Sequence, residues 1–301
     1  MQWPDNPWDL YWQNGILHSC IPRDAADAAV LDEVWRTLAC GLKPDSPVLD
    51  LACGNGAVPA AMLDVNPYLS LTAVDLATIV PETLAGKWSS LRAVKFLAGT
   101  DMSCLPFKAG SFMAVTSQFG IEYADIGKTL GEAARVLAPG GFLTLVIHHR
   151  DSDVLRASRH DLEELDSLLV PGGLVESLTC FVAGTVSLEA LEASARSWLG
   201  SDSRKTNQIS GQVMAGIDRI ITARQRGDHR ENYLAETIPR RMDAQRERLR
   251  QQTAAAVNEA GAEEIAAQLE ERCMSAVELQ ALASNADEPS LLAWKLSAVR
   301  G

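Results

Sequence analysis

The chain has 301 residues, 47% of them apolar, and a formal net charge of −12 from 27 Lys and Arg against 39 Asp and Glu residues. A chain of this length and apolar content can bury a sizeable core, which excludes global disorder. The acidic balance disfavours a nucleic-acid partner, because the overall field of the protein repels phosphate.

The first 24 residues are rich in aromatic side chains and proline. Three of the seven tryptophans, Trp3, Trp8 and Trp12, lie within this segment. We interpret it either as an arm that packs on the following domain or as a flap that closes over a ligand. In the second case Tyr11, Trp12 and His18 would lie near the bound molecule.

Between residues 25 and 150, apolar runs typical of strands alternate with segments of helical period. A first helix is expected to end near Cys40, before Gly41 and Pro44. Strands are expected at 47–52, 69–75, 93–98, 112–117 and 142–148, and helices at 57–65, 81–88 and 126–137. Such alternation predicts a parallel sheet joined by right-handed crossovers, with ligands bound outside the carboxyl ends of the strands.

A glycine-rich loop joins the first strand to the next helix. Asp50–Gly56 reads D-L-A-C-G-N-G, and its glycines let the backbone approach a ligand closely at a helix start that favours anionic groups. Asp75 ends the second strand, where a carboxylate can bind a ribose diol. Pro59 stands where the dinucleotide fingerprint G-x-G-x-x-G has its third glycine, which argues against a dinucleotide ligand.

The pattern D-x-A-C-G-x-G resembles that of the class I S-adenosylmethionine-dependent methyltransferases, and the chain is most similar to the group called methyltransferase type 11. The resemblance runs from about Pro47 to His149. Two more segments carry it: Asp101–Phe107 reads D-M-S-C-L-P-F, and Ser117–Gly120 reads S-Q-F-G.

The resemblance implies S-adenosylmethionine as the cofactor. Asp75 would accept hydrogen bonds from the ribose hydroxyls, Asp101 would accept one from the adenine amino group, and Asp50 would hold the ammonium group. Leu76 would pack on the adenine, and the backbone of Met102 would donate to it. The cofactor-binding residues implied in this way are Asp50, Ala52, Gly54, Gly56, Asp75, Leu76, Asp101, Met102, Ser117 and Gln118.

Methyl transfer from a sulfonium is a direct displacement, so the protein mainly aligns the acceptor, and a base is needed only if the acceptor must lose a proton. His148 and His149 end the fifth strand, where alternation directs them to opposite faces. One of them can therefore reach the acceptor; the alternative is one packed and one solvated histidine. Glu122 and Tyr123 are the other candidate catalytic residues.

After Arg150 the pattern becomes helical. Helices are expected to begin at Asp161 and to cover 187–199, 207–225 and 229–271, the last interrupted near Pro239 and Gly261. The arginine-rich stretch 240–250 forms either a solvated helix face or a contact for an anionic substrate. Two strand-like segments, 276–282 and 291–299, flank a turn at 284–289 and predict a hairpin.

Together these elements predict an α/β fold: a Rossmann-like, doubly wound, mostly parallel seven-stranded sheet with a C-terminal antiparallel hairpin and a helical insertion after strand five. The expected domains are an N-terminal arm and helix at 1–40, a cofactor-binding core at 41–150, a helical insertion at 151–260, and the hairpin at 261–301. The insertion would serve as a lid or as a dimerisation element.

We therefore expect a methyltransferase that acts on a small-molecule acceptor. The alternatives are a methyltransferase for RNA or protein and a non-catalytic, cofactor-binding regulatory protein; a homodimer is left open. No signal-peptide pattern opens the chain and no apolar run reaches the ~18 residues of a transmembrane helix, so we expect a cytoplasmic protein without a membrane partner. The six cysteines form no C-x-x-C pair, which argues against a metal site and fits a reducing compartment.

Overall fold

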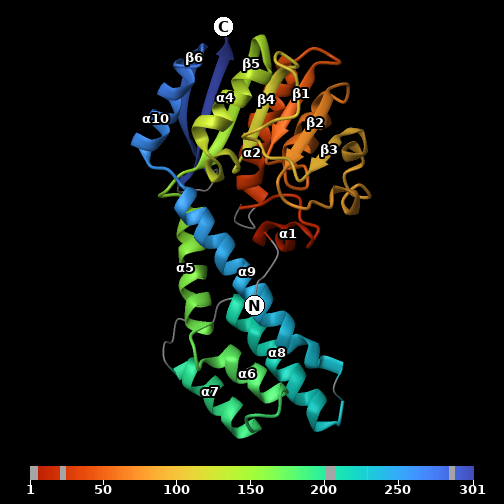
Figure 1. Ribbon diagram of the computed structural model, residues 1–301, viewed down its shortest axis with the longest axis vertical. Helices are drawn as coiled ribbons and strands as arrows, with labels where there is room; N and C mark the ends of the chain where they lie inside the picture. Colours follow the sequence, from red (N-terminus) through yellow and green to blue (C-terminus); the bar gives the residue numbers. More distant parts are fainter. Residues whose placement is uncertain (1–5, 21–24, 201–207, 229, 285–288) are drawn as a thin grey trace. The chain divides into compact units, whose positions relative to one another are not determined.

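A computed structural model describes residues 6–20, 25–200, 208–228, 230–284 and 289–301 (Figure 1). The chain divides into two compact units, one made of residues 1–156 and 251–301 and the other of residues 157–250. Trp3 of the expected arm and most of the expected turn at 284–289 lie outside the described residues. Among the described helices, none is long and apolar enough to cross a membrane.

The first unit is built on a seven-stranded sheet with the strand order β3-β2-β1-β4-β5-β7-β6. Strands β1 to β5 pair in parallel, whereas β7 is antiparallel to both β5 and β6. The predicted fold, with its C-terminal hairpin, is therefore confirmed. The strands are β1 (Pro47–Leu51), β2 (Ser70–Asp75), β3 (Lys95–Ala98), β4 (Phe112–Gln118), β5 (Leu137–His148), β6 (Met274–Ala283) and β7 (Leu291–Arg300).

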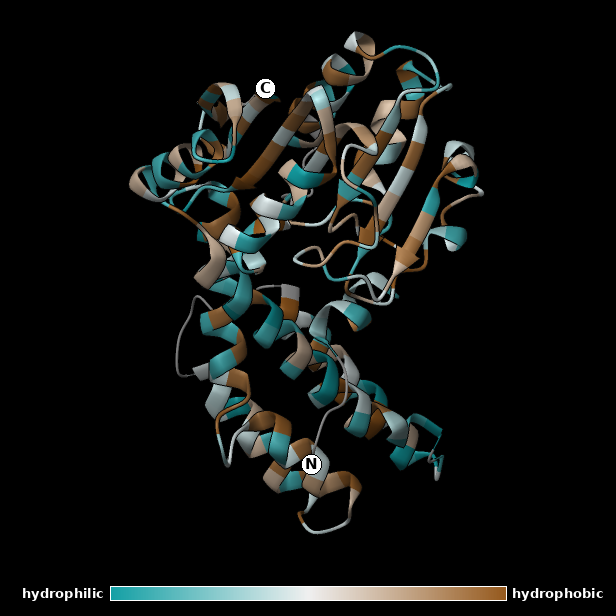
Figure 2. Cartoon of the chain, turned by 45° about the horizontal axis from the view of Figure 1, so that its top comes forward, coloured by the Kyte–Doolittle hydropathy of each residue, from teal (hydrophilic) through white to brown (hydrophobic). Residues whose placement is uncertain are grey.

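Both faces of the central strands β1 and β4 are buried, which explains why these strands read as continuous apolar runs. Val48 and Leu49 are neighbours on β1, yet they belong to different hydrophobic clusters, because successive side chains point to opposite faces. Figure 2 shows that apolar residues dominate the strands, while the helices carry apolar and polar residues together. The helices of this unit are α1 (Pro7–Trp12), α2 (Ala25–Gly41), α3 (Ala57–Val65), α4 (Ile126–Val136) and α10 (Glu259–Glu270).

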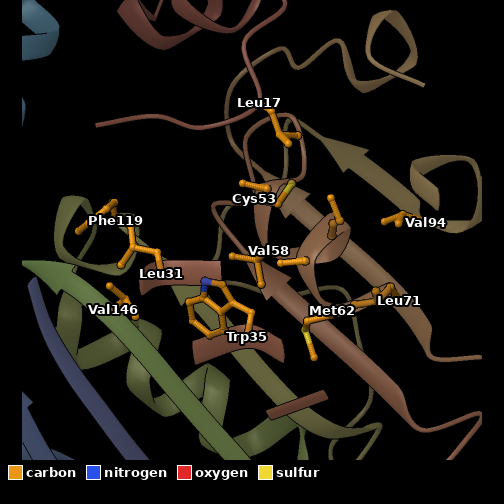
Figure 3. Packing of buried hydrophobic residues seen from close by; sticks show 14 of the residues in the cluster. Leu17, Leu31, Trp35, Cys53, Val58, Met62, Leu71, Val94, Phe119 and Val146 are labelled. Atoms are coloured by element: carbon orange, nitrogen blue, oxygen red, sulfur yellow. The ribbon is translucent and has the colours of Figure 1, made fainter. Parts of the chain in front are cut away.

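The cluster on one face is centred on α2 and α3. Trp35 is fully buried and packs with Met62 and Val146 (Figure 3). Its indole N–H donates to Gln118 Oε1 at 2.6 Å, which satisfies the one polar atom of this side chain. This contact fixes the carboxyl end of β4 relative to α2.

Two sequence predictions in this unit are wrong. The helix expected at 81–88 is replaced by two short 3₁₀ segments, η1 (Pro81–Thr83) and η2 (Ser89–Ala93). A segment this short has too few hydrogen bonds to offset helix nucleation, and Gly86 within it further disfavours a helix. The residues 139–141, expected to separate a helix from strand five, lie inside β5, where the pairing with β4 shifts register between Phe112 and Ala114.

The second unit is helical and has its own core, which includes Leu165, Leu191, Ile217 and Met242. The helices of the insertion region are α5 (Asp153–Leu168), α6 (Leu174–Val182), α7 (Leu188–Gly200), α8 (Gln208–Gln225), η4 (Arg230–Tyr233) and α9 (Leu234–Ala255).

Helix boundaries in this region differ from the predicted ones. Asp161 does not begin a helix but lies inside α5, whose start is capped by Ser152 Oγ, which accepts from the N–H of Leu155 at 3.3 Å. Helix α6 was not expected. Pro239 lies inside α9 and does not interrupt it, and the interruption expected near Gly261 lies instead at residues 256–258, between α9 and α10.

Candidate functional site

The sheet order reverses between β1 and β4, and a cavity of about 710 Å³ lies there, at the carboxyl ends of the strands. Its walls come from α1, from the loops after β1, β2, β3 and β4, and from one residue of α9. The wall residues in chain order are Asn6, Pro7, Trp8, Trp12, Ser19, Ala52, Asp75, Leu76, Thr100, Asp101, Met102, Ser103, Phe119, Gly120, Tyr123, Ala124, Asp125 and Gln251.

The loops after β1 and β4 meet at the floor of this cavity. A Cβ atom added to Gly120 would lie 2.3 Å from the Cβ atom of Ala52, so only glycine fits there. Ala52 and Phe119 both have positive φ angles, 52° and 53°, which non-glycine residues rarely adopt. Backbone strain of this kind is concentrated at functional sites.

Asp75 is the carboxylate at the end of β2. Its Oδ2 accepts from the N–H of Gly54 at 2.7 Å and its Oδ1 accepts from the N–H of Ala77 at 2.8 Å. Burial raises the pKa of Asp75 to about 6, although the two N–H donors act to lower it. Each carboxylate oxygen keeps a second lone pair, so Asp75 can still accept from a pair of hydroxyl groups in the cavity.

Asp50 is fully buried beneath the same loop. Its Oδ1 accepts from Thr116 Oγ1 at 2.8 Å, whereas its Oδ2 has no hydrogen-bond partner. Burial raises the pKa of Asp50 to about 8, and the charge of Asp75 adds to the shift. Asp50 lines a small chamber of about 10 Å³, which shares Trp12, Ser19 and Ala52 with the large cavity. An orphaned, buried carboxylate oxygen fits a cationic ligand group such as an ammonium.

Asp101 and Met102 lie in the loop after β3 and line the cavity with Leu76. Asp101 Oδ1 accepts from the N–H and the hydroxyl of Ser103, at 2.8 and 2.7 Å, which lowers the pKa of the carboxyl. Leu76 is 64% exposed and lines the cavity, so it offers apolar surface to a ligand there. This end of the cavity therefore offers a charged acceptor beside apolar surface.

The N-terminal strap, residues 6–20, roofs the cavity. Its Trp12 ring lies so close to Gly54 that a Cβ atom on this glycine would be 2.3 Å from the ring. The indole N–H of Trp8 donates to Gln251 Oε1 at 3.0 Å. Tyr11 and His18, which were expected near a ligand, do not line the cavity. Burial lowers the pKa of His18.

His148 and Glu122 form a fully buried pair just behind the cavity wall. Glu122 Oε1 lies 2.7 Å from His148 Nδ1 and also accepts from the His148 backbone N–H at 2.9 Å. The imidazole packs on Phe119 and meets the edge of Tyr123, with ring centroids 4.3 and 5.9 Å apart. Burial acts to lower the pKa of His148, but the contacts with Cys20 and Glu122 outweigh it and raise the pKa to about 9.

His149 has different surroundings. Its ring stacks on Trp294 with centroids 4.5 Å apart, and its Nδ1 accepts from the N–H of Asp151 at 3.0 Å. Burial lowers its pKa. Neither histidine lines the cavity, whereas Tyr123 does.

The remaining predicted residues lie around the same loops, at varying distances from the cavity. Gly56 begins α3, and a Cβ atom there would meet Leu91 and Phe96 rather than the cavity. Ser117 is buried and its hydroxyl has no partner. Gln118 lines the small chamber.

This part of the chain is similar in sequence to a known protein family. Residues 48–141 match a family model described as a methyltransferase domain. A demethylmenaquinone methyltransferase of Thermus thermophilus is 38% identical over 120 residues, which are 37% of this chain and 53% of that protein. The uncharacterized methyltransferase YodH of Bacillus subtilis is 32% identical over 100 residues, or 33% of this chain and 42% of that protein.

Among solved structures, the 1,6-didemethyltoxoflavin-N1-methyltransferase of Burkholderia thailandensis is similar with a TM-score of 0.34 and 21% identity, over 42% of this chain and 54% of that one. The chain spans about half the length of the curated relatives that it matches.

Proposed function

We propose that the chain, which contains a class I S-adenosylmethionine-dependent methyltransferase domain, transfers a methyl group from S-adenosylmethionine to a small-molecule acceptor. The observation that carries the proposal is the cavity at the point where the strand order reverses, with Asp75 and Asp101 in its walls and Asp50 in the adjoining chamber. Several relatives are named as demethylmenaquinone methyltransferases, which supports a small-molecule acceptor.

Three carboxylates would hold the cofactor. Asp75 would accept from the ribose diol, Asp101 from the adenine amino group, and the orphaned oxygen of Asp50 would face the ammonium group. When bound, the cofactor supplies an electrophilic methyl group on a positively charged sulfur. The Trp12 ring over Gly54 would exclude water from this part of the site.

Alignment of the acceptor accounts for most of the catalysis in this proposal. His148 does not line the cavity, and its contacts with Cys20 and Glu122 raise its pKa to about 9, which favours the protonated imidazole at neutral pH and argues against a role as base there. We assign His148 and Glu122 a positioning role behind Phe119 and Tyr123, and Tyr123 the contact with the acceptor. His149 is assigned a structural role against Trp294.

The arginine-rich part of α9 gives little support to an RNA substrate. Arg246 pairs with Asp243 at 2.6 Å, and Arg250 pairs with Asp166 at 2.9 Å. Paired arginines on an acidic chain present less free positive charge to phosphate.

The test is to incubate the protein with cofactor labelled in its methyl group and an extract separated into small molecules, RNA and protein. Label in the small-molecule fraction is the expected result. Label in the RNA or protein fraction would support the macromolecular alternative. Binding of S-adenosylhomocysteine without any transfer would leave a non-catalytic binder.

A further inference from the structure

The residues assigned to the cofactor do not account for the whole wall of the cavity. The other wall residues include Trp8 of α1, Tyr123 of the loop after β4, and Gln251 of α9. These three side chains form one group: the Trp8 and Tyr123 rings lie 5.3 Å apart, and the Trp8 indole donates to Gln251. We call them the aromatic end of the cavity. None of them has a role in holding the cofactor.

The rings of the aromatic end are fixed before any ligand arrives. Trp8 meets Tyr123 edge to face at 84° and stacks on Trp12 at 27°. Asn6 caps the short helix that carries Trp8 by accepting from its backbone N–H at 3.1 Å. A preorganised aromatic wall suits a flat apolar ligand, because little side-chain freedom is lost on binding.

The charged side chains that line the cavity, among the described residues, are all acidic. Asp75, Asp101 and Asp125 line it, and the lining residues that the structure describes include no Lys, Arg or His. Asp125 is paired with the exposed Lys128 at 2.9 Å, which offsets part of its charge. Asp101 accepts hydrogen bonds from the hydroxyl and the N–H of Ser103, and the charge of Lys128 offsets only a minor part of its own. An anionic ligand would therefore meet repulsion and no counter-charge, whereas a cation would be attracted to both the carboxylates and the rings.

We propose that the aromatic end is the acceptor site, that it takes a flat aromatic molecule that is neutral or positively charged, and that it rejects acceptors bearing phosphate or carboxylate. This inference rests on the proposed function. In the reaction, a lone pair of the acceptor forms the bond to the methyl carbon while the carbon–sulfur bond breaks and its electron pair stays on sulfur. A proton of the acceptor, where it has one, leaves to water.

The experiment measures binding of three matched hydroxyindoles to the full chain saturated with S-adenosylhomocysteine. The probes are 5-hydroxyindole, which is neutral, 5-hydroxytryptamine, which is a cation, and 5-hydroxyindole-3-acetate, which is an anion. Calorimetry should show that the neutral and cationic compounds bind, with the cation at least tenfold tighter than the anion. Trp8→Ala should weaken both by tenfold or more, and Trp8→Phe should restore most of the loss.

A charge change tests the selectivity directly. Gln251→Lys places a cation in the wall and should tighten binding of the anion at least tenfold while weakening that of the cation. Gln280→Lys is the matched control, because Gln280 is exposed on β6 and does not line the cavity. The control should leave all three affinities unchanged.

Two results would overturn the inference. One is equal binding of the anion and the cation by the unmodified protein; the other is no binding of any hydroxyindole while S-adenosylhomocysteine binds. Failure of S-adenosylhomocysteine itself to bind would instead overturn the proposed function, and the acceptor site with it.

Discussion

The side chain of Asn55 holds Trp12 in place over the glycine loop. Asn55 is fully buried, and its Nδ2 donates to the Trp12 carbonyl at 3.0 Å and to the Ile16 carbonyl at 2.9 Å. Its Oδ1 accepts from the N–H of Val80 at 2.8 Å. One amide thus connects the strap, the glycine loop and the loop after β2, and it keeps the Trp12 ring against Gly54.

Removing this amide should release the strap. Asn55→Ala removes the side-chain hydrogen bonds to the Trp12 and Ile16 carbonyls and the acceptor of the Val80 N–H, so it should lower the affinity for S-adenosylhomocysteine about tenfold and shift the tryptophan fluorescence toward that of exposed indole. The matched control is Asn66→Ala, since Asn66 Nδ2 also donates to two carbonyls, those of Ala39 and Leu42, but away from the cavity. Equal losses of cofactor affinity in the two variants would mean that the effect of Asn55 is general stability.

Asp75 should make cofactor binding depend on pH. Its pKa of about 6 means that the carboxylate is ionised at neutral pH and becomes protonated as the pH falls through about 6. The affinity for S-adenosylhomocysteine should therefore fall between about pH 7 and pH 5. Asp75→Asn should bind more weakly by about 1.5–3 kcal/mol at neutral pH and lose this dependence, so the difference from the unmodified protein should narrow below pH 6. Asp64→Asn, an exposed change in the same unit, should match the unmodified protein in calorimetry; a pH-independent affinity in the unmodified protein would remove Asp75 from the site.

Asp50 should release a proton when the cofactor binds. With a pKa of about 8, its carboxyl is mostly protonated at pH 7, and an ammonium group placed against it favours the ionised form. Calorimetric titrations with S-adenosylhomocysteine in two buffers of different ionisation enthalpy should show release of up to about 0.9 proton at pH 7. Asp50→Asn should abolish the release. Unchanged release in that variant would assign the proton to another group.

The sequence was most informative where the chemistry is local. Asp75 ends one apolar run, and Asp101 follows another by three residues. Parallel strands bring such residues to the same edge of the sheet, so their positions in the cavity wall could be predicted from the sequence. The tryptophan-rich N-terminus pointed to the strap in the same way. The glycine loop marked the turn at Gly54, although nothing in the pattern G-N-G revealed that Asn55 reaches back to Trp12.

Contacts between distant segments could not be predicted. Gln251 reaches the cavity by bonding Trp8, which is 243 residues earlier in the chain, and a glutamine in a polar helix gives no local sign of this. The environments of His148 and His149 follow from Glu122 and Trp294, which no periodicity connects to them. The helix predicted at 81–88 is not formed. Local propensity alone does not stabilise a helix of about two turns, and the tertiary contacts that decide its conformation cannot be read from the local sequence.

The helical unit should be separable from the cofactor site. Its core residues all lie within 162–249, and the wall residues of the cavity all lie outside 157–250. Replacing residues 157–250 by a short flexible linker should therefore leave the affinity for S-adenosylhomocysteine within about threefold of the full chain. If the insertion acts as a lid, one of the two roles expected from the sequence, methyl transfer should be lost. Full transfer by the shortened chain would exclude the lid.

The two histidines should respond to pH in opposite directions. The pKa of His148 is raised in the folded protein, so the stability that this group contributes is fully present below its unfolded pKa of about 6.5 and is lost as the pH rises to about 9. The loss should be on the order of 3 kcal/mol in the free energy of unfolding. The pKa of His149 is lowered, so its contribution is present above about 6.5 and is lost as the pH falls.

Urea denaturation at pH 5.5, 7.5 and 9 of the unmodified protein, His148→Gln and His149→Gln separates these contributions. His148→Gln should be destabilised by about 3–5 kcal/mol at pH 7.5, because the buried Glu122 loses its cationic partner, and its stability should fall less from pH 7.5 to 9 than that of the unmodified protein. His149→Gln should keep the loss at alkaline pH and reduce the loss at acid pH. A stability that falls from pH 7.5 to 9 equally in His148→Gln and the unmodified protein would show that the buried pair is not charged at neutral pH, and His148 would then be free to act as a base.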